Sequence, residues 1–431
     1  MATEPNLTRI TPREQGEFAG EGGEFSGAEV GGEVANSTQP PSVATRKATN
    51  SNEFAKTKFD LATPPQRACT QGKKRALPPQ PKVSFLLVTY NQENYIRLAI
   101  DSILQQDYEN FEVIVSDDCS SDGTFAAASA VADPRVKVVK TSYNGGVGAN
   151  LNFAFSHASG DVVVLCGGDD LVLAHFTTRV LQALKEGADA VYSNFSEIDS
   201  HGNRAQTLNF VYENATPAKL LRKAFLHANI MPSPAMALTR EAAEAVFELS
   251  FSLVNYEDYA LHTRLLLAGF KPRFLEEKLV LYRVTKEGVS HGSSARIRAR
   301  LEEKALMDLF LQADLELVKQ MFEGEIASLG CTPTQRSKTL FLAVMALDSD
   351  NDKKREWGYE TAVKFLATRE NFELAHAEFG LSFKEFLTYA ERVKPNDAKY
   401  HAKYLKYTRL FKIFATLTAV LAVSLVAVLA F

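Results

Sequence analysis

The chain has 431 residues, and this length predicts two folded units rather than one or four. Its hydrophobic fraction of 45%, its charged fraction of 23% and its net charge of -4 are those of a globular protein with no overall attraction to nucleic acid, so we expect no nucleic-acid partner. Its 4 cysteines have neither a CxxC pair nor a histidine at metal-ligand spacing, so neither a zinc site nor a disulfide framework is indicated.

The N-terminal segment, 1–81, is rich in Gly, Ser, Thr, Pro, Asn and Glu and poor in large apolar residues. Such a segment cannot bury enough surface to offset the entropy of ordering it, so we predict that it is disordered. Its later part, with a basic run at 73–75, fits a solvated linker better than a localisation or docking tail. Its first residues lack the basic start and apolar run of a secretory signal, which predicts a cytoplasmic location.

From Val83 the sequence changes to apolar runs of strand length separated by helical patterns. The run 83–90 predicts a strand, and Ile96, Ile100 and Leu104 then recur at helical spacing. Strands alternating with helices indicate an α/β fold, a parallel sheet with helices on both faces. The further predicted strands are 111–116, 135–140 and 161–166, and the helices between them are 121–132 and 147–158.

The next part of the chain is less regular, and the part after 292 reads as mostly helical. Thr216-Pro217 is typical of a helix start, and 301–322 is a long amphipathic run. Strands are also predicted at 188–195 and 272–284, and a helix at 256–269. We therefore predict a catalytic domain over 82–292 and a helical region of unknown role over 293–409, in which we find no chemistry-bearing cluster.

The C-terminal segment from Ile413 to Phe431 contains no charged residue. At about 1.5 Å per residue it would span roughly 28 Å, close to the thickness of a bilayer's hydrocarbon core. A helix that is apolar on every face favours a membrane anchor, here over 410–431, rather than a buried helix. The basic residues before it, among them Lys406, Arg409 and Lys412, predict that the catalytic domain stays in the cytoplasm.

Polar clusters follow three of the predicted strands, where ligands bind in open parallel sheets. The clusters are Thr89-Tyr90-Asn91, 117–124 and Gly167-Gly168-Asp169-Asp170. Much of 117–124 fits a turn with helix capping, but Asp118 could accept the N–H of a nucleobase. The pair Asp169 and Asp170 offers oxygen ligands suited to Mg²⁺ or Mn²⁺ with phosphate oxygens completing the shell.

A further acidic pair, Glu257 and Asp258, opens a predicted helix. Acidic residues in a first turn are favoured by the helix dipole, so without further context simple capping is the better interpretation of this pair.

Taken in order, these segments resemble the family 2 glycosyltransferases, which have the GT-A fold. The resemblance runs from PKVSFLLVTYNQENYIRLAIDSILQQDYENFEVIVSDDCSSDGT through NGGVGANLNFAFSHASGDVVVLCGGDD and VNYEDYALHTRLLLAG to VLYRVTKEGVSHGSS. It implies inverting transfer of a sugar from a nucleoside-diphosphate sugar to an acceptor hydroxyl. The predicted membrane anchor suggests that the acceptor is a saccharide or a lipid-linked saccharide, in cell-surface polysaccharide or glycolipid synthesis.

The resemblance also implies a role for each acidic cluster. Thr89, Tyr90 and Asp118 would contact the nucleoside, Asp169 and Asp170 the metal and diphosphate, and Asp258 would be the general base. Tyr282, Arg283 and His291 resemble a loop that closes over the diphosphate. Gly167 departs from the family, because an Asp often stands at its position, and this puts a sugar or ribose contact in doubt.

Two other functions remain open from the sequence. A membrane-tethered scaffold would bind nucleotide through a degenerate transferase domain, although the intact set of acids argues against it. A nucleotidyltransferase would have a Gly-rich loop with Lys or Arg near the first strand, and that loop is missing here.

Overall fold

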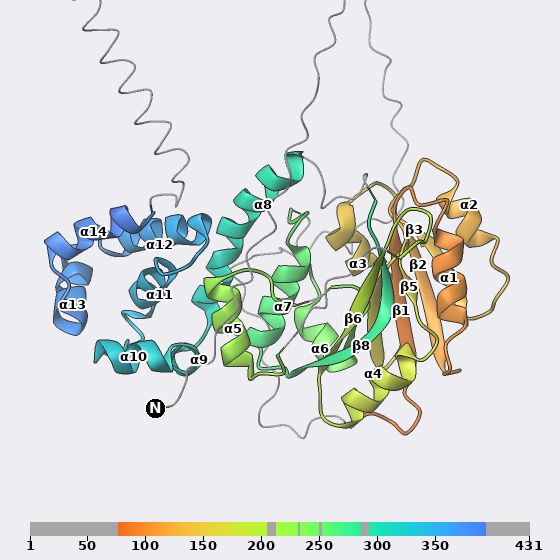
Figure 1. The fold of residues 1–431 in the computed structure, drawn as a ribbon, viewed down its shortest axis with the longest axis horizontal. Coiled ribbons are helices and arrows are strands. Elements are labelled where there is room, and N and C mark those ends of the chain that lie inside the picture. Colours follow the sequence, from red (N-terminus) through yellow and green to blue (C-terminus); the bar gives the residue numbers. More distant parts are fainter. Residues whose placement is uncertain (1–75, 205–212, 232, 250–251, 286–292, 394–431) are drawn as a thin grey trace, which may run out of the picture. The chain divides into compact units, whose positions relative to one another are not determined.

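The computed structural model describes residues 76–204, 213–231, 233–249, 252–285 and 293–393 (Figure 1). The predicted tail, 1–81, lies mostly outside these ranges, and the predicted anchor, 410–431, lies wholly outside them. Within the described ranges, no helix is both long enough and apolar enough to cross a membrane.

The described residues contain an 8-stranded sheet with the strand order β3-β2-β1-β4-β7-β6-β8-β5. Strands β1 to β4 are mutually parallel, and their residues alternate between the two apolar faces as the continuous apolar runs predict. The sheet as a whole is mixed, however, because β7 runs antiparallel to β4 and β6, and β5 runs antiparallel to β8. The strands are β1 (Val83–Thr89), β2 (Phe111–Asp117), β3 (Val136–Lys140), β4 (Val162–Gly167), β5 (Leu171–Val172), β6 (Ala190–Ile198), β7 (Met236–Thr239) and β8 (Pro272–Arg283).

Helices cover both faces of the sheet, as predicted. Alternate residues of β1 point to opposite faces: Phe85 and Leu87 belong to one hydrophobic cluster and Leu86 to another. The first cluster includes residues of α1 (Ile96–Leu104), α2 (Thr124–Ser129) and α4 (Phe176–Lys185). The second includes residues of α3 (Gly146–Ser156), α5 (Pro217–Leu226), α6 (Arg240–Val246) and α7 (Glu257–Leu267). Figure 1 shows α1 and α2 on the side of the sheet opposite α3 and α6.

The predicted helix start at Thr216-Pro217 is confirmed, because the Thr216 hydroxyl accepts the Lys219 N–H at 3.4 Å. The amphipathic run 301–322 is helical, as predicted for this region, and it is divided into three segments. A 3-10 helix (Met307–Gln312) follows the first segment, and Asp314 then caps a new helix by accepting the Leu317 N–H at 2.7 Å. This polar cap side chain stops the apolar pattern from continuing as one helix.

Part of the C-terminal helical region shares a hydrophobic core with the helices that cover the sheet. The ring of Phe225 on α5 contacts Phe310, Phe322 and Trp357 edge to face, with centroids 5.1, 5.5 and 6.1 Å away. The region therefore packs directly against α5 through these three residues, whereas Ala375 and Leu381 belong to a separate hydrophobic cluster. The helices of the region are α8 (Ser293–Leu306), α9 (Leu315–Met321), α10 (Glu323–Leu329), α11 (Lys338–Ala346), α12 (Asp352–Phe365), α13 (Arg369–Phe379) and α14 (Phe383–Val393).

Candidate active site

The carboxyl ends of β2, β1 and β4 bring the predicted polar clusters together. The Asp118 N–H donates to the Thr89 carbonyl at 2.9 Å, and the Gly168 N–H donates to the Val88 carbonyl at 2.8 Å. Gly168 is required for this approach, because a Cβ there would lie 2.7 Å from the Cβ of Thr89. The three strand ends thus form one continuous edge.

At this edge Thr89 is buried, and its hydroxyl donates to the Gln92 side-chain oxygen at 2.8 Å. Tyr90, the next residue, is 46% exposed. Of these two predicted nucleoside contacts, only Tyr90 therefore presents its side chain freely to a ligand.

Asp118 is buried and already holds protein donors. One carboxylate oxygen accepts the Gly145 N–H at 3.0 Å and the Thr141 hydroxyl at 3.1 Å, and the other accepts the Gly146 N–H at 2.8 Å. A carboxylate offers about four lone-pair sites, so one remains for a ligand N–H. Asp118 therefore fixes the turn before α3, and its contact with a nucleobase stays a prediction.

Asp169 and Asp170 form a pair of like charges, of which Asp170 is buried and Asp169 half-buried. Burial raises the pKa of both carboxyl groups, and the charge of Asp169 raises the pKa of Asp170 further. Asp170 Oδ1 accepts the backbone N–H of Arg283 at 2.8 Å. A Cβ on Gly167 would lie 3.1 Å from an oxygen of each of these two carboxylates, so the glycine leaves open the space on which both oxygens converge.

This arrangement fits a hard divalent cation. Two converging carboxylates whose charges repel would be stabilised by Mg²⁺ or Mn²⁺, which commonly take one or two carboxylates together with substrate phosphates. The described residues hold no group of three or more Asp, Glu, His or Cys side chains that could bind a metal, so phosphate and water would have to supply the other ligands.

Arg283, a predicted substrate contact, is buried at the end of β8. Its Nε donates to the Asp169 carbonyl and its Nη1 to the Asp199 carbonyl, both at 2.8 Å. The guanidinium lies 4.5 Å from the centre of the Tyr95 ring. Arg283 therefore holds the acidic turn in place rather than extending into open space. His291 lies outside the described residues.

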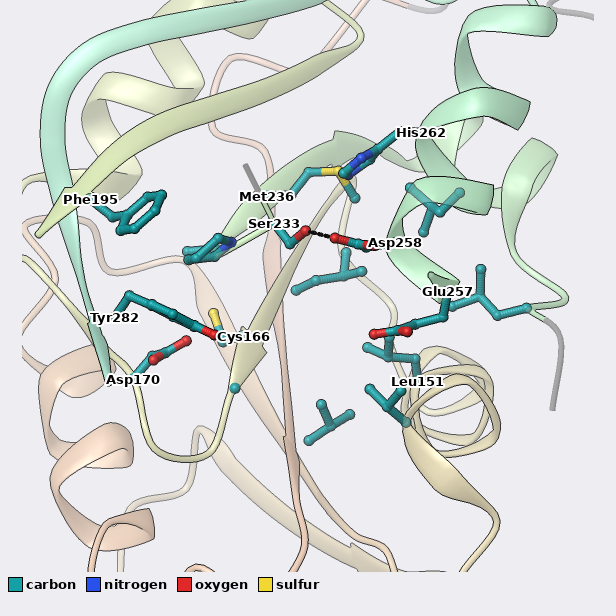
Figure 2. Close-up of a pocket in the computed structure, with 18 of the residues that line it drawn as sticks. Leu151, Cys166, Asp170, Phe195, Ser233, Met236, Glu257, Asp258, His262 and Tyr282 are labelled. Carbon is teal, nitrogen blue, oxygen red and sulfur yellow. Dashed lines mark hydrogen bonds between the residues drawn. The ribbon is translucent and has the colours of Figure 1, made fainter. Parts of the chain in front are cut away.

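A cavity of about 400 Å³ lies between the acidic turn and the start of α7. Figure 2 shows Asp170 with Cys166 and Tyr282 at one end, and Glu257 and Asp258 at the other. Apolar side chains make up much of the wall between them. The residues are Val88, Val147, Leu151, Leu165, Phe195, Pro234, Ala235, Met236, Leu249 and Leu261.

Asp258 is oriented by the loop before β7. One carboxylate oxygen accepts hydrogen bonds from the Asn229 side-chain nitrogen at 3.0 Å and from the Ser233 hydroxyl, and the other accepts the Tyr259 N–H at 2.6 Å. Asn229 also meets Nδ1 of His262 at 3.2 Å, and burial lowers the pKa of that imidazole to about 4. Sequence reasoning missed Asn229 and Ser233, because neither stands in a recognisable motif.

Glu257 differs from Asp258 in its hydrogen bonding. Burial and then the charge of Asp258 raise the pKa of Glu257 to about 8, and Oε2 finds no hydrogen-bond partner among the described residues. Glu257 is therefore protonated near neutral pH, where it can donate a hydrogen bond but cannot accept a proton as a base.

We expect Glu257→Gln to remove a pH dependence of stability. The folded-state pKa is raised from 4.5 to about 8, so the wild-type free energy of unfolding falls as pH rises through this window. Glutamine cannot ionise, so the advantage of the variant over wild type should grow from the lower to the upper pH. Denaturant unfolding of both proteins across the window measures the difference, and parallel curves would contradict the assignment.

The chain is similar to known glycosyltransferases. The model of the family "Glycosyl transferase family 2" matches residues 84–247. A putative glycosyltransferase of Bacillus subtilis, EpsE, is 32% identical over 213 residues, which are 48% of this chain and 74% of the relative. WfgD of Escherichia coli, a UDP-Glc:alpha-D-GlcNAc-diphosphoundecaprenol beta-1,3-glucosyltransferase, is 28% identical over 221 residues, 50% of this chain and 82% of the relative.

Among solved structures, TarS 1-349 of S. aureus in complex with UDP has a TM-score of 0.47 and 18% sequence identity. The match covers 70% of this chain and 93% of that one.

Proposed function

Because this chain belongs to glycosyl transferase family 2 and is a glycosyltransferase, we propose that it transfers a sugar from a nucleoside-diphosphate sugar to an acceptor hydroxyl with inversion. The observation that carries this proposal is the position of Asp258. Asn229 and Ser233 orient its carboxylate at one end of a cavity whose other end holds Asp170.

In this mechanism Asp258 acts as the general base. Three of about four lone-pair sites on its carboxylate are filled by protein donors, which leaves one for the acceptor's O–H. Asp258 takes the hydroxyl proton as the acceptor oxygen bonds to the anomeric carbon. The bond from that carbon to the diphosphate breaks at the same time, and the electron pair leaves with the diphosphate.

Asp169 and Asp170 would hold Mg²⁺ or Mn²⁺ in the space beside Gly167. When bound, the cation supplies positive charge that stabilises the leaving diphosphate. Arg283 supports the same turn, because its main-chain N–H fixes Asp170 and its guanidinium fixes the Asp169 carbonyl. The exposed ring of Tyr90 would contact the nucleoside, together with the remaining acceptor site on Asp118.

We also propose that the acceptor is a lipid-linked saccharide in cell-surface polysaccharide or glycolipid synthesis. The names of two similar proteins support this proposal: WfgD of Escherichia coli uses a diphosphoundecaprenol-linked sugar, and a Campylobacter jejuni relative uses GalNAc(5)-diNAcBac-PP-undecaprenol. The uncharged segment 413–431 and its basic flank would place a cytoplasmic catalytic domain beside such an acceptor.

Inversion is tested on the product. A screen of nucleoside diphosphates and their sugars by thermal shift, with and without Mn²⁺, identifies the donor, because a ligand of the native state raises the melting temperature. The proton coupling constant at the anomeric centre of the product should then report the configuration opposite to that of the donor. Retention would exclude single displacement with Asp258 as base.

Truncation after Lys412 should release the protein from membranes. The removed segment carries no charged residue. The basic flank that remains would bind anionic lipid only by electrostatic attraction, which salt screens. Fractionation of the full-length and truncated chains after a high-salt wash makes the comparison. A truncated chain that still sediments with washed membranes would exclude the anchor.

A further inference from the structure

The helix α7 carries Glu257 and Asp258. At its third residue it lacks the acidic or amide side chain that can accept the backbone N–H of the N-cap residue. In a capping box, an acidic or amide side chain at the third helical residue accepts the N–H of the N-cap residue. Here the N-cap is Tyr256, and the third residue is Tyr259, whose hydroxyl donates instead to the Ala224 carbonyl. The Tyr256 side chain makes no cap hydrogen bond either.

A side chain from the C-terminal helical region supplies the missing acceptor. Glu302 on α8 is buried, and its Oε2 accepts the Asn255 N–H at 2.7 Å and the Tyr256 N–H at 3.1 Å. One turn earlier on α8, Arg298 donates from Nε to the Asn255 side-chain oxygen at 3.1 Å. Two side chains of one helix face thus hold the turn that leads directly into Glu257 and Asp258.

A second helix of the same region holds the other side of this first turn. Lys354 on α12 is fully buried, and its Nζ donates to the Tyr259 hydroxyl at 2.9 Å and to the Ala224 carbonyl at 2.5 Å. Tyr259 is the residue after Asp258. The start of α7 is therefore fixed from α8 and α12 as well as from the loop that carries Asn229 and Ser233.

We propose that Glu302 is a positioning residue for sugar transfer, and that through it the C-terminal helical region sets the orientation of Asp258. The proposal rests on the proposed function in that Asp258 is taken as the base. Glu302 is not among the residues that line the cavity, although its partner Asn255 is. It acts on the rate through the turn 255–256, because a displacement of about 1 Å in a reacting group can lower a rate by about 10²-fold.

The test measures kcat and the KM for donor in Glu302→Ala. We expect kcat to fall by about 10- to 10²-fold while the KM for donor stays unchanged, since only the orientation of the base is lost. Glu302→Gln should recover most of the rate, because its amide oxygen still accepts an N–H. If the alanine variant does not fold, Glu302→Asp takes its place: the shorter side chain cannot reach both N–H groups, and a wild-type kcat in it would overturn the proposal.

Arg300→Ala is the matched control on the same helix. Arg300 makes an exposed ion pair with Asp352 at 3.1 Å, and such pairs contribute little, so kcat should not change. A Glu302→Ala variant that melts earlier but turns over like Arg300→Ala would reduce Glu302 to a stabilising contact and overturn the proposal.

A double variant separates this proposal from the proposed function. In an Asp258→Asn background, Glu302→Ala should lower the residual rate no further, because both changes act on one step. If Glu302→Ala lowers the rate of Asp258→Asn by the same factor as it lowers the wild-type rate, Glu302 acts elsewhere, and the positioning role alone is overturned. If Asp258→Asn by itself turns over at the wild-type rate, the proposed function fails, and the positioning role fails with it.

Discussion

Asp258→Asn should lower turnover by about 10² to 10⁴-fold while leaving donor binding nearly intact. Asparagine can keep the hydrogen bonds from Asn229 and Ser233 through its oxygen, so the loop before β7 should hold its position. What the variant loses is the group that takes the acceptor's proton. The loss should therefore appear in kcat and not in the affinity for donor.

The matched control is Glu257→Gln, which changes the neighbouring carboxyl in the same way. Glu257 is protonated near neutral pH because its pKa is about 8, so replacing it with a neutral amide should preserve the base chemistry. Turnover and melting temperature of both variants decide between the two residues. Loss of a base should lower activity by at least about 10²-fold, so if Asp258→Asn keeps more than about a tenth of the activity, the base lies elsewhere.

Asp170→Asn should remove metal-dependent donor binding. The amide offers a neutral oxygen where a divalent cation needs charge. Mutation of residues that only support a metal ligand typically costs about 10- to 100-fold in metal affinity, so the affinity for donor in the presence of Mn²⁺ should fall by at least that much. The variant should be no less stable than wild type without metal, because it ends the repulsion between Asp169 and Asp170.

Titration of donor with and without Mn²⁺ tests this prediction. A control variant, Asp101→Asn, changes a partly exposed carboxylate on α1 that pairs with Arg97 on the same helix, and it should bind donor like wild type. Unchanged donor affinity together with an unchanged metal requirement in Asp170→Asn would exclude Asp170 as a ligand.

Local sequence pattern was sufficient to predict the parallel half of the sheet. Runs such as 111–116 and 161–166 are apolar on both faces, and this pattern is typical of strands covered by helices on both sides. The strands β5 and β7, which run antiparallel to their neighbours, were not predicted, since they are too short to show a period in the sequence. Their pairing depends on contacts between distant parts of the chain.

The same distinction applies to the site. Residues at strand ends could be located from sequence, because the carboxyl ends of parallel strands meet at one edge. The hydrogen-bond partners of those residues could not be identified from sequence. Arg283 binds two carbonyls, and Asp118 holds the N–H groups of Gly145 and Gly146, contacts that no spacing in the sequence encodes. Glu302 reaches α7 from a region without any motif.

Donor turnover tests the central claim most directly. Release of nucleoside diphosphate and glycosylation of an undecaprenyl-diphosphate-linked saccharide are measured together, for wild type and for Asp258→Asn, with a donor that raises the melting temperature in Mn²⁺. We expect one nucleoside diphosphate for each sugar transferred, release that depends on the acceptor, and loss of both in the variant. A donor that binds tightly and is never turned over would contradict the account and favour a nucleotide-binding scaffold.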